Sequence, residues 1–111
     1  MAILVKSIIP SKYAENSQTT QYTATGCKAR LDKFTATNVT GTAATLSVNL
    51  VASGGTAGAN NKIISTRTIA AGESYVCTPL MGQVLEAGGF ISVIAGTASA
   101  IVISCAGVEI T

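Results

Sequence analysis

Residues 43–52, AATLSVNLVA, carry the clearest structural pattern in this chain of 111 residues. Apolar and polar side chains alternate along them, which places the two kinds on opposite faces of an extended strand. One apolar and one polar face are typical of a strand in an antiparallel sheet that covers a core. The residues predicted to face the core are Ala44, Leu46, Val48, Leu50 and Ala52, and those predicted to face away are Thr45, Ser47 and Asn49.

The rest of the chain repeats this arrangement in short segments. No stretch has the spacing of an amphipathic helix, and Gly, Asn, Ser and Pro separate one β-prone run from the next. This pattern predicts an all-β fold, a single antiparallel β-sandwich of about seven or eight short strands, either immunoglobulin-like or jelly-roll. The predicted strands are 2–9, 20–25, 28–38, 43–52, 62–69, 74–78, 90–95 and 100–106, with 107–110 as a final edge segment.

The segment 28–38, KARLDKFTATN, alternates with a slip of one residue. Ala29 and Leu31 fall on one face of a regular strand, whereas Phe34 and Ala36 fall on the other. A one-residue bulge near Asp32 would bring all four to the same side. We therefore predict a bulge at this point.

Three kinds of turn are predicted. TNVTGTAATLSV, residues 37–48, is typical of a hairpin with an Asn/Gly turn. IAAGESYV (69–76) and LEAGGFISV (85–93) place the same Ala-Gly corner before two strands, where glycine supplies a positive φ. SGGTAGANN (53–61) predicts an exposed loop, either a flexible tip or a backbone contact with a partner.

The amino-terminal part is predicted to differ from the rest. Residues 1–19 are interpreted as an apolar strand, stopped by Pro10, followed by a polar arm, and residues 20–111 as the sandwich domain. Residues 2–9 either leave the main sandwich and pair with a neighbouring chain by β-augmentation, or form an ordinary edge strand of their own sheet. The predicted contact residues are Ile3, Val5, Ile8, Ile9, Tyr13 and Tyr22.

The composition argues against several classes of function. Only 11% of the residues are charged and the net charge is +2, too weak for a footprint on nucleic acid. No apolar run is long enough to span a membrane, no secretory leader is expected, and a cytosolic site of synthesis is indicated. The three cysteines are widely spaced, which predicts small buried side chains rather than a disulfide framework. A neutral surface rich in Thr, Ser and Ala favours burial against other proteins.

Catalytic chemistry is not expected. The chain has no histidine, so a His-based triad or zinc site is excluded, and no cofactor or metal is predicted. No spacing suggests a carboxylate pair, and the absence of tryptophan argues against a typical sugar site, although Tyr13 and Tyr22 are candidates for exposed aromatics. The acidic residues lie in separate turns and strand ends: Glu15, Asp32, Glu73, Glu86 and Glu109.

The order of these motifs resembles small structural proteins of tailed bacteriophages. The resemblance runs through FTATNVTGTAATLSVNLV, SGGTAG, KIISTRTIAAGESY, LMGQVLEAGGFISVIAG and VISCAGVEIT, and covers about residues 28–111. At the second Ala-Gly corner this chain has Gly89, where members of that family often have an acidic or polar residue. The resemblance implies a component of the virion, assembled in the host cytoplasm, without specifying head or tail.

Within that class, a capsid decoration (cement) protein is favoured. A small neutral β-sandwich can bury its surface at capsomer junctions against the major capsid protein, and many weakly bound copies would stiffen the shell. A homotrimer, or another homo-oligomer, would match a symmetric site on the head. The alternative is a small tail- or neck-associated structural or receptor-binding module. Neither interpretation involves nucleic acid or a membrane.

Overall fold

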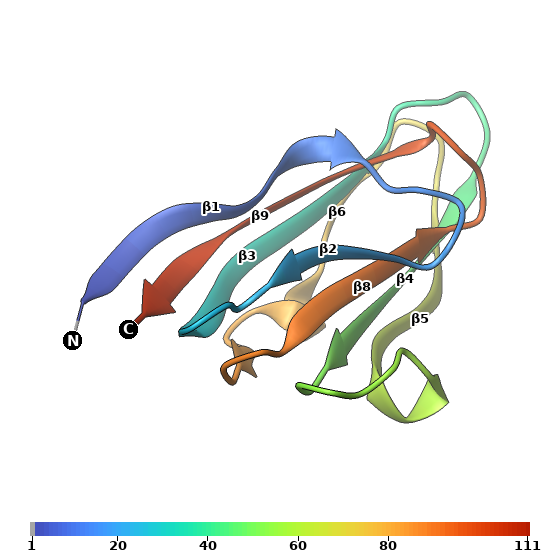
Figure 1. The fold of residues 1–111 in the computed structure, drawn as a ribbon. Helices are drawn as coiled ribbons and strands as arrows, with labels where there is room; N and C mark the ends of the chain where they lie inside the picture. Colours follow the sequence, from blue (N-terminus) through green and yellow to red (C-terminus); the bar gives the residue numbers. More distant parts are fainter. Residues whose placement is uncertain (1) are drawn as a thin grey trace.

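The computed structural model describes residues 2–111, which form two antiparallel sheets packed face to face (Figure 1). Sheet A has the strand order β1-β9-β3-β6, with β7 paired to β3, and sheet B has the order β2-β8-β4-β5. The predicted antiparallel β-sandwich is confirmed. The elements are β1 (Ile3–Tyr13), β2 (Thr19–Thr23), β3 (Lys28–Asn38), β4 (Ala44–Val51), η1 (Ala59–Asn61), β5 (Lys62–Ile69), β6 (Ser74–Val76), η2 (Thr78–Leu80), β7 (Val84–Leu85), β8 (Phe90–Ala95) and β9 (Ile101–Ile110).

The strand order decides between the two sandwich types that the sequence leaves open. The pairs β4–β5, β3–β6, β2–β8 and β1–β9 are nested, so the chain forms one long antiparallel ribbon that turns back at the 53–61 loop. Rolling up this ribbon places β9 between β1 and β3, and β8 between β2 and β4. Two sheets made in this way are a jelly roll. The termini lie side by side at one end of sheet A (Figure 1).

The predicted bulge in β3 is confirmed. Pairing between β3 and β9 shifts between Leu31 and Lys33, so Asp32 has no partner residue. The extra residue reverses the parity of the strand, and the apolar residues on both sides of it point into the core. All four are fully buried: Ala29, Leu31, Phe34 and Ala36.

Gly107 of β9 lies opposite Leu31, next to this bulge. A Cβ atom at position 107 would overlap the carbonyl oxygen of Arg30 and would also lie 3.1 Å from Cγ1 of Ile8. Backbone from β3 and a core side chain from β1 thus converge on one point of β9. Only glycine leaves room for this approach.

The predicted alternation in β4 holds through Leu50. The pairing of β4 with β5 shifts on both sides of Val48, but the pairing of β4 with β8 is unbroken and sets Leu50 beside the buried core residue Ile91. Leu50 is half-buried and packs against the core as predicted, whereas Ala52 is exposed, so the prediction is wrong for Ala52. On the other face, Ser47 and Asn49 are buried rather than solvated.

Strand β1 is longer than predicted and belongs to the chain's own sheet. It continues through Pro10 to Tyr13, with register shifts against β9 between Ser7 and Ile9 and between Ile9 and Lys12. Pro10 lies within the second irregularity of an edge strand, where a missing N–H costs no ladder bond. The predicted stop at Pro10 is therefore wrong, and of the two alternatives for residues 2–9 the structure has the edge strand. Met1 of the expected 1–19 segment lies outside the described residues.

The predicted 37–48 hairpin is also wrong, because β3 lies in sheet A and β4 in sheet B. Asn38, fully buried at the end of β3, holds the crossing between the sheets. Its Nδ2 donates to the carbonyls of Thr42 (2.8 Å) and Ile69 (3.0 Å), and its Oδ1 accepts from the backbone N–H (2.9 Å) and hydroxyl (2.7 Å) of Thr40. A polar side chain thus replaces the ladder bonds that a hairpin would supply.

The repeated Ala-Gly corner forms the same turn at both places. In residues 70–73 and 86–89 the last N–H donates to the first carbonyl, at 3.0 and 2.9 Å. The third residue of each turn, Gly72 or Gly88, has a positive φ of 73° or 85°. This is the position at which a type II turn requires glycine, so the prediction is confirmed.

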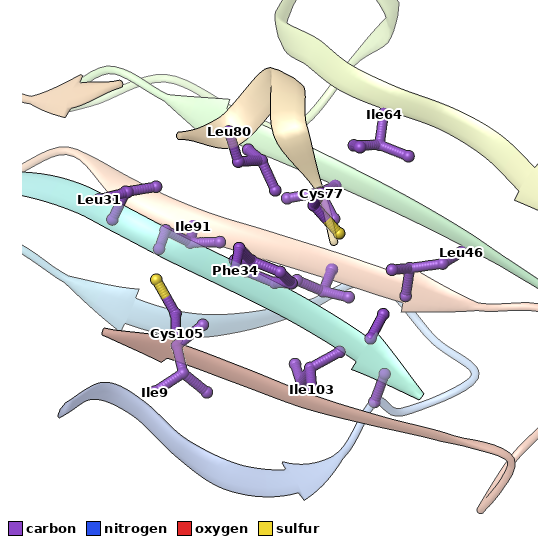
Figure 2. Packing of buried hydrophobic residues seen from close by; sticks show 14 of the residues in the cluster. Ile9, Leu31, Phe34, Leu46, Ile64, Cys77, Leu80, Ile91, Ile103 and Cys105 are labelled. Atoms are coloured by element: carbon purple, nitrogen blue, oxygen red, sulfur yellow. The ribbon is translucent and has the colours of Figure 1, made fainter. Parts of the chain in front are cut away.

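The core fills the space between the sheets (Figure 2). Phe34 is fully buried, and apolar side chains from both sheets surround it. The three cysteines are free and buried, as predicted. Leu80 of η2, a turn that the sequence did not predict, adds to the core from the connection between β6 and β7. No helix within residues 2–111 is both long and apolar enough to cross a membrane.

Replacing Gly107 with alanine should destabilise the fold by at least about 3 kcal/mol, because the added methyl group displaces the β3 backbone at the bulge. Gly41→Ala is the control, since a Cβ there meets nothing within 4 Å. Urea unfolding followed by circular dichroism measures both. Equal midpoints for the two variants would contradict the assigned packing.

Replacing Asn38 with alanine should destabilise the fold by about 2–3 kcal/mol, because buried backbone groups lose their partners. Asn60→Ala is a matched control on an exposed side chain and should unfold like the wild-type chain. The same unfolding measurement applies. A neutral Asn38→Ala would show that water or backbone adjustment replaces the side chain at the crossing.

Candidate interaction surface

The structure divides the predicted contact residues by their exposure. Ile3, Val5 and Tyr13 are 62%, 84% and 50% exposed. Ile8 and Ile9 are buried, because the register shift after Ser7 brings this part of β1 over the core. Both side chains belong to the core of the chain itself. The accessible apolar surface of β1 therefore lies in its first half and, at its far end, at Tyr13.

Tyr22, the sixth predicted contact residue, is half-buried and connects the two sheets. Its hydroxyl on β2 donates to the carboxylate of Glu109 on β9, and Nζ of Lys6 on β1 lies 3.4 Å from the same carboxylate. The Tyr22 hydroxyl and then Lys6 lower the pKa of Glu109, while burial and the hydrogen bond raise the pKa of Tyr22. The group is a polar clamp between the sheets, with its charges compensated.

The outer face of sheet A carries an apolar row at the end where the termini lie. Strand pairing places Val5 beside Val108, Val108 beside Arg30, and Arg30 beside Val84. Val108 is buried by its neighbours, whereas Val5 and Val84 are exposed. The sequence does not predict Val84 as a surface residue, since its strand is only two residues long. Val5 and Val108 are adjacent, and Arg30 separates them from Val84. Neighbouring apolar side chains on an exposed sheet face are typical of a contact surface.

The charged side chains on this surface occur mostly as pairs. Lys28 and Glu86 are 3.4 Å apart, and Arg30 and Asp32 are 2.9 Å apart. Exposed pairs of this kind add little to stability, but they cancel the field of the surface. Other charges are similarly engaged: Lys12 pairs with Glu15, Arg67 stacks over Tyr75, and Glu73 accepts the N–H of Ala70. The surface therefore offers shape and apolar area rather than net charge.

The 53–61 loop is exposed, as predicted, but hydrogen bonds tie its base to sheet B. Asn49 is buried, and its Nδ2 donates to Gly58 O (2.9 Å) and to Oδ1 of Asn61 (2.7 Å). Gln18 donates to the hydroxyl of Ser92 at 2.7 Å and lies 3.4 Å from Oδ1 of Asn49. The alternating pattern assigned Asn49 to solvent because it cannot reveal that a loop folds back over the strand.

Two shallow grooves open on the surface, with volumes of about 360 and 290 Å³. The larger lies where the ends of β4 and β5 face β7, and apolar side chains such as Leu50, Ile63 and Val84 contribute to its lining. Glu86 is the acidic residue of its lining and pairs with Lys28. The smaller groove has mostly polar neighbours and one cation, Lys62. Neither groove gathers the convergent reactive groups of a catalytic site.

The reactive side chains do not form a catalytic centre within residues 2–111. Burial raises the pKa of Cys77 and of Cys105 to about 12, so both thiols stay protonated and are poor nucleophiles. No group of three or more Cys, Asp or Glu side chains in this range could hold a metal ion.

Comparison with known proteins supports the fold. A chain from the Bacillus endospore appendages described as a novel family of disulfide-linked pili aligns with a TM-score of 0.56 and 16% identity, over 98% of this chain and 88% of that chain. A chain from the structure of infectious bursal disease virus, Gx strain, aligns with a TM-score of 0.58 and 11% identity, over 98% of this chain and 33% of that one. This chain thus spans about a third of the viral protein. No family model and no curated protein matches the sequence.

At these identities the likeness concerns the fold alone. It shows that this chain shares its strand arrangement with a pilus protein and with a protein of a virus structure. The chain is thus placed among all-β domains of the jelly-roll type.

Replacing Tyr22 with phenylalanine should destabilise the chain at neutral pH, with a difference from wild type that shrinks as the pH falls. The pKa of Glu109 is lower in the folded chain than its ordinary value of 4.5. Its contribution is therefore present above that value and is lost as the pH falls through the folded pKa. Urea midpoints measured across this range test it, with exposed Tyr13→Phe as control. A difference that does not change with pH would contradict the clamp.

Proposed function

We propose that this chain is a non-enzymatic structural component of a bacteriophage particle. The observation that carries the proposal is a complete jelly roll whose surface presents apolar side chains and paired charges without a reactive centre. The motif order resembles phage structural proteins, and the two similar folds come from a pilus and a virus structure. All of these favour a role in assembly.

Within this class, the proposed role is a capsid decoration protein. It would bind as a homo-oligomer at capsomer junctions, contact the major capsid protein and stabilise the head. A neutral surface is removed from water at low cost, and many copies convert weak contacts into a stable coat. A homotrimer would suit a three-fold position, and other closed oligomers would suit other symmetric positions. The chain would then reside in the virion after assembly in the host cytoplasm.

The copy number in purified particles tests this role. Quantitative mass spectrometry should find this chain in numbers comparable with the major capsid protein, because a decoration protein occupies positions over the whole shell. The number of a single ring would instead support a tail or neck component, including a receptor-binding module. Absence from the particle would contradict the structural role.

A further inference from the structure

The four edges of the two sheets are not equally protected. Strand β5 carries Thr66 at a φ of 48° and two register shifts against β4, while β2 is short, polar and has one shift of its own. On the other side of sheet A, β6 and β7 have only three and two residues. Residues 3–7 of β1, the free β1 edge, differ from these. They are regular and uninterrupted by proline, with one charged side chain, Lys6.

The hydrogen bonds of β1 show which backbone groups of this edge are unused. Ala2 and Thr111 exchange both backbone bonds, at 3.3 and 2.9 Å. Bonded and non-bonded pairs alternate in an antiparallel ladder, so the next bonded residues of β1 are Leu4 and Lys6. Ile3, Val5 and Ser7 consequently direct their N–H and C=O groups away from β9. Those six groups are spaced evenly about Val5.

We propose that the free β1 edge pairs with the same edge of a second copy of this chain, antiparallel and centred on Val5. A two-fold axis at this residue places Val5 opposite Val5 of the second copy, and Ile3 opposite its Ser7. All six unused groups then form hydrogen bonds, and both copies of sheet A become one continuous sheet. A register shifted by one residue would instead set unused groups of one copy against bonded groups of the other.

The side chains suit this register. On the outer face, Val5 packs against Val5 of the second copy, so that the apolar row continues from one chain into the other. Val5 is the most exposed apolar side chain of β1, and this contact removes it from water. On the inner side, Leu4 lies opposite Lys6 of the second copy. The charge of Lys6 is compensated by Glu109 within its own chain, so no unpaired like charges approach across the axis.

A contact of five residues on each side is small for a stable dimer. It is therefore expected to be weak in solution and to become effective where many copies are held together, as in the proposed particle. In this respect the inference extends the proposed function. Its own test uses the purified chain, so a copy number that contradicts the decoration role leaves the result unaffected.

Cysteine cross-linking tests the register. In the proposed pair the two Val5 Cα atoms are about 5.5 Å apart, within the range of a disulfide, whereas the two Leu4 Cα atoms are about 8 Å apart. Under oxidised glutathione, Val5→Cys should therefore give a covalent dimer, and Leu4→Cys and exposed Val84→Cys should not. The natural cysteines are buried and do not interfere. Equal cross-linking of all three variants, or none at Val5→Cys, would overturn the proposal.

Proline substitution tests the hydrogen bonds without adding a cross-link. Val5→Pro removes a donor that the single chain does not use, so it should unfold like wild type and yet weaken self-association at least about tenfold. Leu4→Pro removes a donor to β9 and should lower stability instead. Sedimentation equilibrium and urea unfolding measure the two effects. Wild-type chain that remains monomeric at every concentration, or Val5→Pro that associates as wild type does, would also overturn the proposal.

Discussion

The close approach of β3 and β9 at Gly107 is the constraint on which the rest of the fold depends. β9 lies between β1 and β3 and is therefore the strand through which sheet A is held together. At Gly107 the bulge of β3 brings a carbonyl against β9, and Ile8 of β1 approaches from the other side. Without the bulge, the apolar residues of β3 would divide between two faces. Without the glycine, the bulge could not lie against its neighbour.

The sequence predicted those features that depend on local periodicity. Strand positions, the bulge near Asp32 and the repeated Gly72 and Gly88 turns follow from side-chain parity and from the steric freedom of glycine, which a single segment reveals. The choice of pairing partners does not follow from the pattern of any single segment. Nothing in 37–48 says that its two strands lie in different sheets, because the hydrogen bonds of Asn38 that replace the ladder reach Ile69, far away in sequence.

The candidate surface was predictable to the same degree. The apolar character of residues 2–9 indicated a strand but not which half of it would be exposed, since the answer depends on a register shift against β9. Tyr22 is among the predicted contact residues, but its hydrogen-bond partner Glu109 comes from the other end of the chain and could not be predicted. Val84 gave no signal, because a two-residue strand has no periodicity. Residues brought together by the rolled ribbon are the ones that sequence reasoning misses.

Edge protection links the fold to its proposed use. A sheet edge with unused backbone groups invites association, and proteins normally interrupt it with bulges, charges, proline or short strands. Three of the four outer positions here have such interruptions, and β1 acquires its own only beyond Ser7. The regular part of β1 also contains Val5, the most exposed valine among the described residues. The one lysine of this part, Lys6, forms an ion pair with Glu109 of the same chain. A small neutral domain that leaves this edge open is suited to controlled assembly, because a single short edge limits pairing to one partner.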